Sequence, residues 1–241
     1  MKKTILYMAI LLIPMMGIGQ DKNVMSVERI FAKPDKVAEF EKALAAHAQK
    51  YHTGDWKWRV SQIESGPDAG GYAIAEGPNT WTTLDTRGNL GAEHTADYQK
   101  NIAPLTTNAG SSTYMVLRGD LSTVQPTDFT DKISITHIYP KAGTVGKFEA
   151  RTKKVKKTWE ASGETVAVYQ VHFSGAPQFL IVYRHKQGWK EKETNFRKPF
   201  PERHNAANGE GAYDEYLESV QKYTDKTWGE MLVLRADLSS K

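Results

Sequence analysis

The stretch Val116-Leu117-Arg118-Gly119-Asp120-Leu121-Ser122 returns almost unchanged as Val233-Leu234-Arg235-Ala236-Asp237-Leu238-Ser239 at the end of the chain. Six of the seven positions are identical, and the two copies lie 117 residues apart. Two halves that end in the same sequence are typical of an internal duplication.

The openings of the two halves repeat as well. Residues 25–41 align with residues 133–149 without a gap at a constant shift of 108 residues. The identical pairs are Ser26/Ser134, Ile30/Ile138, Lys33/Lys141, Val37/Val145, Phe40/Phe148 and Glu41/Glu149. The shift grows to 117 only before the last strand, which places an insertion near residues 200–212. A repeat of this length predicts two duplicated domains and not a solenoid.

Each half is predicted to run strand, helix, strand, strand, helix, strand. Val37, Phe40, Leu44 and His47 recur at spacings of three and four, the stripe of an amphipathic helix. Short runs rich in β-branched residues, bounded by turns, indicate the strands. The predicted strands are 25–31, 56–64, 71–76 and 113–118 in the first half, and 133–139, 165–173, 178–183 and 230–235 in the second. Helical regions are expected at 96–102 and 212–223.

This element order predicts an α+β fold. One β-α-β-β-α-β unit makes a four-stranded antiparallel sheet with both helices on one face. The bare face must find a partner, and two copies supply it by curling into a fused eight-stranded barrel with helices outside. The predicted modules are 20–123 and 132–241, joined by a short polar linker at 124–131.

The duplicated strand-turn-helix pattern resembles the dimeric α/β-barrel superfamily of ferredoxin-like modules. That superfamily includes the antibiotic-biosynthesis monooxygenases and the NIPSNAP-like proteins. Here both modules of the barrel would belong to one polypeptide, so a monomer with a pseudo-dimeric barrel is expected, and further association is left open. The resemblance covers nearly the whole chain but rests on no catalytic motif, so it speaks to fold more than to function.

The first 19 residues are predicted to be a signal peptide. Lys2 and Lys3 precede an apolar run over residues 5–18, and Gly17 and Gly19 provide small residues for cleavage before Gln20. The run is shorter than the roughly 20 residues of a spanning helix. We therefore favour an exported protein, periplasmic or extracellular and free of the membrane after cleavage, over a membrane-anchored one.

Composition narrows the function classes. The chain has no cysteine, which excludes disulfides, a thiol nucleophile and thiolate metal ligands. Its net charge of +4 falls to +2 when Lys2 and Lys3 are removed. The densest basic run, at residues 153–157, is predicted to be a solvated helix face and no nucleic-acid partner is expected.

The polar residues of the strands are the candidate ligand contacts. On the second strands, Trp58, Gln62 and Glu64 share one face, as do Gln170 and His172 in the copy. We expect this face to line the lumen; the alternative is that the two amides satisfy each other or the backbone.

The first strands leave their orientation open. Glu28 lies on one face, whereas Arg29 and His137 occupy equivalent positions on the other. Glu28 is the lumen residue if the more apolar face packs beneath the helices. Both Glu28 and His137 are therefore kept as candidates.

No metal site is predicted. None of the spacings HxH, HxxxH or HExxH occurs, although His137, His172 and His185 fall on or beside strands of the second half. His47 and His52 are assigned to the first helix. No sequence motif indicates a cofactor, and haem binding is left open. The repeated Arg118/Asp120 and Arg235/Asp237 pairs are interpreted as structural ion pairs.

Three functions remain open. The first is an exported barrel that binds a small apolar or amphipathic molecule in its lumen. The second, implied by the resemblance, is a cofactor-independent or haem-associated monooxygenase in which His137 or His172 acts as base or axial ligand. The third is a structural module whose lumen its own side chains fill.

Overall fold

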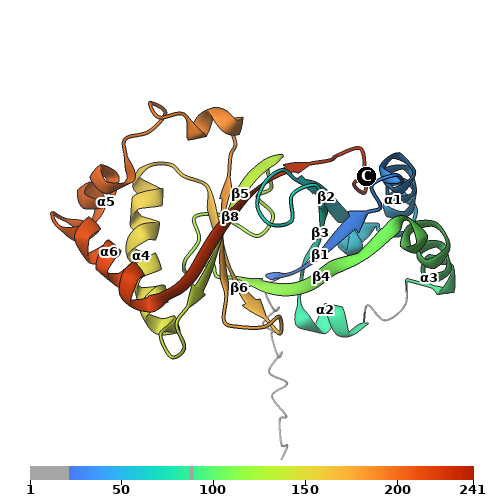
Figure 1. Cartoon of the computed structure of the whole chain (residues 1–241). Coiled ribbons are helices and arrows are strands. Elements are labelled where there is room, and N and C mark those ends of the chain that lie inside the picture. The colour runs from blue at the N-terminus through green and yellow to red at the C-terminus, as the bar shows by residue number, and fades with distance from the viewer. Residues whose placement is uncertain (1–21, 87–89) are drawn as a thin grey trace, which may run out of the picture.

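The computed structural model describes residues 22–86 and 90–241, which form a closed barrel of eight antiparallel strands with helices outside (Figure 1). The strands are β1 (Val24–Ala32), β2 (Trp58–Ile63), β3 (Tyr72–Asn79), β4 (Thr106–Leu117), β5 (Lys132–Pro140), β6 (Val166–His172), β7 (Phe179–Arg184) and β8 (Thr224–Leu234). Around the barrel they follow the order β1-β3-β2-β8-β5-β7-β6-β4, and β4 closes on β1.

The helices lie on two opposite sides of the barrel, one group for each module (Figure 1). The helices are α1 (Val37–Tyr51), α2 (Trp81–Thr86), α3 (Ala92–Asp97), α4 (Val145–Ala161), α5 (Phe200–Asn208) and α6 (Ala212–Tyr223). Short helical turns occupy η1 (Gly54–Trp56), η2 (Tyr98–Ile102), η3 (Ala103–Leu105) and η4 (Gly188–Lys192). The predicted α+β barrel of two ferredoxin-like halves is confirmed.

The closing strand of each half joins the two modules. β4 pairs with β1 of its own half and, from Tyr114 to Leu117, with β6 of the other half. β8 pairs with β5 of its own half and, through its last residues, with β2 of the first half. The repeated sequence that ends each half therefore lies at the two seams of the barrel.

The core has three parts, one inside the barrel and one beneath the helices of each module. Alternate residues of every strand point inward and build the lumen cluster, which includes Met25, Ile63 and Leu232. Phe40 and Leu44 of α1 pack on the outer face of the first module, and Phe148 and Trp159 of α4 do the same in the second. Burial of such an apolar stripe is what holds an amphipathic helix on a sheet.

The closing strands are longer than the sequence pattern predicts. β4 begins at Thr106 and β8 at Thr224, whereas apolar alternation starts only near residues 113 and 230. The added part of β4 is small, polar and largely exposed, yet it stays extended because it pairs with β1 as far as Ala32 and Thr106. Backbone hydrogen bonding decides those strand ends, and a hydrophobic pattern cannot show it.

Other boundaries shift by smaller amounts. The helix predicted at 96–102 begins earlier, as α3 at Ala92, and continues as η2 to Ile102. The second-half helix is confirmed as α6, and the insertion near 200–212 contains α5. The predicted signal peptide at 1–19 lies outside the described residues. Among the residues that are described, no helix has the length and apolar character needed to cross a membrane.

Candidate functional site

The barrel holds a cavity of about 470 Å³, lined by residues from all eight strands. This size lies within the roughly 300–1,000 Å³ of typical small-molecule pockets. A cavity of this size favours the ligand-binding hypotheses over a lumen filled by its own side chains. Most of the wall is apolar, with contributions from Val27, Ala73, Met115, Ile135, Leu180 and Leu232.

The strand face that we expected to line this cavity points the other way. Gln62 and Gln170 lie on the outer face, where Arg235 and Arg118 approach their side-chain oxygens at 3.5 and 3.2 Å. Trp58 also faces outward and stacks on His52 with ring centroids 3.5 Å apart.

The remaining candidates divide between the two sides of the wall. Glu28 faces outward, where the Tyr98 hydroxyl lies 3.4 Å from its carboxylate. Glu64 is exposed after the end of β2, and His172 faces outward beside Trp81. Of the predicted residues, Trp58 and His137 border the cavity; the Trp58 ring packs in the outer core of the first module, and the His137 ring lies in the ionic cluster of the lumen. Both strand faces are buried in such a barrel, so alternation alone does not separate inside from outside.

The repeated arginines have the structural role that we predicted. Arg235 donates to Asp237 at 2.9 and 2.7 Å, and Arg118 donates to Asp120 at 2.9 Å with both nitrogens. Arg235 also binds Glu41 of α1, which lies in the other module. The guanidinium lowers the pKa of the Glu41 carboxyl group. Arg118 pairs in the same way with Glu149 of α4, so each arginine links the end of one module to a helix of the other.

One end of the lumen carries a compensated ionic cluster. Arg29 donates to the Glu230 carboxylate, at 2.9 Å through Nη1, and to Asp68 at 2.7 Å. His137 Nε2 lies 2.7 Å from Glu230 Oε1, and Gln178 donates to His137 Nδ1 at 2.7 Å. Trp228 stacks flat on the His137 ring at 3.5 Å.

The charges in this cluster stabilise one another. Burial disfavours the carboxylate of Glu230, but hydrogen bonds from His137 and Arg29 outweigh it and lower the pKa of Glu230. Burial likewise disfavours the Arg29 cation, and the bonds to Glu230 outweigh it and raise the pKa of Arg29. Both groups are charged at neutral pH, as a buried ion pair requires.

The other end of the lumen carries two arginines that no carboxylate neutralises among the described residues. Arg184 pairs with Ile133, four residues along β5 from His137, which corresponds to roughly 13 Å of strand. Arg184 donates to the Tyr169 hydroxyl at 3.0 Å and to the carbonyl of Gln125 at 3.2 Å. Arg59 donates to the carbonyl of Gly77 at 3.1 Å.

Phe129 brings these two cations together. It comes from the predicted linker, and the guanidinium carbons of Arg59 and Arg184 lie 3.6 and 5.4 Å from its ring centre. Burial, followed by the charge of Arg184, lowers the pKa of Arg59. Arginine nevertheless stays protonated in proteins, so the site keeps two positive charges.

Sequence reasoning missed Arg59, Arg184 and Phe129. Arg59 alternates with Ser61 and Ile63 on the strand face opposite to the one that we expected to line the lumen, so it was not among the candidate residues. The available signal was Phe129, a large apolar residue in an otherwise polar linker, which needs a buried place.

Comparison with known proteins supports the fold. No protein-family model matches the chain, and no curated protein matches its sequence. Among solved structures, an anthrone oxidase-like protein superposes with a TM-score of 0.55 at 10% identity, covering 89% of this chain and 92% of that one.

Two further structures give the same result. A candidate monooxygenase from Fusobacterium nucleatum subsp. nucleatum gives 0.54 at 14% identity, over 88% of this chain and 91% of that one. Another from Lactobacillus acidophilus NCFM gives 0.52 at 12% identity, over 92% and 97%. The chain shares its barrel fold with these proteins, and at such identities the likeness concerns the fold alone.

The lumen does not fit a haem held by the histidines that we had considered. Both ring nitrogens of His137 are engaged by Glu230 and Gln178, and His172 lies outside the barrel. An axial ligand needs a ring nitrogen directed at the iron. The same engagement leaves His137 poorly placed as a general base, because its acceptor nitrogen already binds the Gln178 amide.

Proposed function

We propose that the protein binds a small amphipathic anion in the lumen of its barrel. The acidic group of the ligand contacts Arg59 and Arg184, and its apolar body lies along the aliphatic wall. The observation that carries the proposal is the pair of neighbouring guanidinium groups at the edge of an apolar cavity. Asp131 lines the same cavity, but no carboxylate of the described residues forms an ion pair with Arg59 or Arg184.

Electrostatics favour this occupant. Two like charges in a partly buried place repel each other and lose hydration, which costs free energy unless a counter-charge arrives. Guanidinium groups bind carboxylates and phosphates through strong, paired hydrogen bonds. An anionic ligand removes the repulsion and hydrogen-bonds both arginines.

A buried arginine elsewhere shows why the pair matters. Arg151 of α4 is also buried without a carboxylate partner in the described part of the chain, and it lies near the rings of Phe148 and Tyr216. It does not line the lumen cavity, and it donates a hydrogen bond to Thr224 Oγ1 at 3.2 Å. Aromatic faces and one hydroxyl acceptor therefore suffice to hold one buried arginine, whereas Arg59 and Arg184 combine paired charge with open space.

Calorimetric titration with decanoate and naphthoate, each compared with its neutral alcohol, tests the proposal. We expect the carboxylates to bind one per chain, and Arg59→Met or Arg184→Met to weaken them tenfold or more, which is about 1.4 kcal/mol. Arg151→Met is the matched control and leaves the affinity unchanged. Equal binding of acids and alcohols, or of wild type and the lumen variants, overturns the proposal.

Export is part of the same proposal. The basic start, the apolar run and the small residues before Gln20 support a cleaved signal, and a periplasmic or extracellular barrel would meet its ligand outside the cytoplasm. N-terminal sequencing of the protein from its own host is expected to begin at Gln20. Native mass spectrometry of the same sample would show any retained anion and the number of chains per particle.

A further inference from the structure

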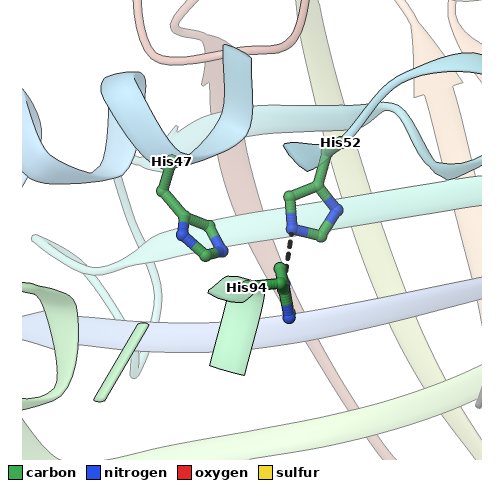
Figure 2. Close-up of side chains that lie close together, drawn as sticks. All are labelled: His47, His52 and His94. Atoms are coloured by element: carbon green, nitrogen blue, oxygen red, sulfur yellow. Dashed lines mark hydrogen bonds between the residues drawn. The ribbon is translucent and has the colours of Figure 1, made fainter. Parts of the chain in front are cut away.

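Three histidines of the first module meet outside the barrel, away from the lumen (Figure 2). His47 comes from α1, His52 from the turn that follows it, and His94 from α3. His47 and His52 are buried and His94 is half-buried. One nitrogen from each ring can be chosen so that all three lie within 4.8 Å of one another. We call these residues the histidine cluster.

His47 directs an unused nitrogen toward its neighbours. Its Nδ1 lies 2.7 Å from the Asp97 carboxylate, which only accepts, so the ring proton is on Nδ1. Its Nε2 is fully buried and has no hydrogen-bond partner within the described residues. A buried polar atom without a partner is costly, which calls for an explanation.

His52 is oriented in the same way. Its Nδ1 lies 3.1 Å from the carbonyl oxygen of Trp56 and 3.5 Å from the Glu76 carboxylate, both acceptors. The proton is again on Nδ1, which leaves the lone pair of Nε2 directed at His94.

His94 completes the cluster. Its Nε2 lies 3.2 Å from Nε2 of His52, a hydrogen bond that Figure 2 draws between these two rings, with His47 beside them. Two nitrogens bound to one tetrahedral zinc ion, at about 2.0–2.1 Å each, stand roughly 3.3 Å apart. The His52–His94 separation of 3.2 Å is close to that value, and a nitrogen of His47 lies within 4.8 Å of a nitrogen of each of the other two rings.

We propose that the histidine cluster is a binding site for a divalent transition-metal ion such as zinc. Imidazole nitrogen suits Zn²⁺, Cu²⁺, Ni²⁺ and Fe²⁺. Asp97 and the Trp56 carbonyl are the outer partners that fix the tautomer and orientation of two ligands, as in known histidine–metal sites. Three protein ligands leave a further position for water or another small ligand.

The duplication supports a specific role for these residues. At the shift of 108 residues, Val155 and Glu160 stand where His47 and His52 stand in the first module. Val155 packs in the apolar core beneath α4, so the same place in the fold is stable without histidine. Packing therefore does not by itself require His47.

Equilibrium dialysis of the full, untagged chain with Zn²⁺ tests the site, and Co²⁺ supplies a visible spectrum. We expect one tightly bound ion per chain. His94→Gln should weaken binding by more than the roughly 10–100-fold that loss of an outer partner costs, and Asp97→Asn by about that amount. His172→Gln, at another half-buried histidine, is the matched control and keeps the affinity.

A second readout does not depend on the folding of a variant. X-ray absorption of the zinc-loaded wild type should show three imidazole ligands near 2.0–2.1 Å. The proposal is overturned if the wild type binds no stoichiometric metal, if His94→Gln binds as tightly as the wild type, or if the absorption spectrum lacks imidazole. These measurements do not involve the lumen, so the metal proposal and the anion proposal can fail independently of each other.

Discussion

Both ends of the lumen carry arginine that is buried or half-buried, but they differ in what surrounds it. Arg29 lies against Glu230 and Asp68, with His137 completing the cluster. Arg59 and Arg184 share an aromatic ring and neutral acceptors, and no carboxylate of the described chain pairs with either. The first end is complete within the protein, whereas the second has charge to offer to a ligand.

This difference distinguishes charged groups that are paired within the protein from charged groups that we propose to pair with a ligand. A buried ion pair that satisfies itself specifies how strands pack, and removing one partner leaves the other charge stranded. An uncompensated cation adds little to the stability of the empty protein and gains its partner only on binding. Substitutions at the first end should therefore lower the free energy of unfolding strongly, and substitutions at the second end should change it little.

The largest effect is expected at Glu230. Glu230→Gln removes the buried counter-charge of half-buried Arg29 and should lower the free energy of unfolding by about 3–5 kcal/mol. Urea denaturation followed by tryptophan fluorescence measures it. A loss below 1 kcal/mol would show that Asp68 alone compensates Arg29. The two ends of the lumen would then not differ in their contribution to stability.

The pH dependence of the same variant is a smaller and sharper test. The folded pKa of Glu230 is lowered from 4.5, so its contribution is complete above that value and is lost as pH falls through the folded pKa. The stability gap between wild type and Glu230→Gln should therefore be constant near neutrality and shrink in acid below pH 4.5. A gap that persists at the lowest pH at which both fold would point to packing instead of charge.

The smallest effect is expected at Arg59. Arg59→Met keeps the aliphatic stem and should change the free energy of unfolding by less than about 1 kcal/mol, because the lost contact with Phe129 is offset by relief of repulsion. The measurement is the same urea denaturation without ligand. A loss of 3 kcal/mol would assign Arg59 to the framework and remove the basis for the anion proposal.

The fold could be predicted from the sequence because each predicted strand and helix of the first half has a counterpart in the second half. The strand runs at 25–31 and 133–139 were weak singly, but their alignment fixed the element order, and the order required a partner for the bare sheet face. Strand ends were less accessible. The start of β4 depends on pairing with β1, and the polar residues there carry no periodic pattern.

The site was harder to predict because a closed barrel buries both faces of its strands. Val60 beneath α1 and Ile63 in the lumen look alike in sequence, so the polar residues between them gave a wrong orientation for Gln62. The histidine cluster was hidden for another reason. His94 joins His47 and His52 only through the folding of α3 against α1, and no local spacing records that contact.

The fusion of both modules has a consequence for what the cavity can distinguish. In a dimer of identical modules, the twofold axis would repeat every lumen side chain on the opposite wall, and the cavity would read the same from both directions. Here the equivalent of Arg29 is His137 and that of Arg59 is Ala167. The seams made by β4 and β8 keep the symmetric backbone. The two modules share one backbone arrangement but line the cavity with different side chains, so its two ends differ in charge. The amphipathic anion that we propose would therefore bind in one orientation.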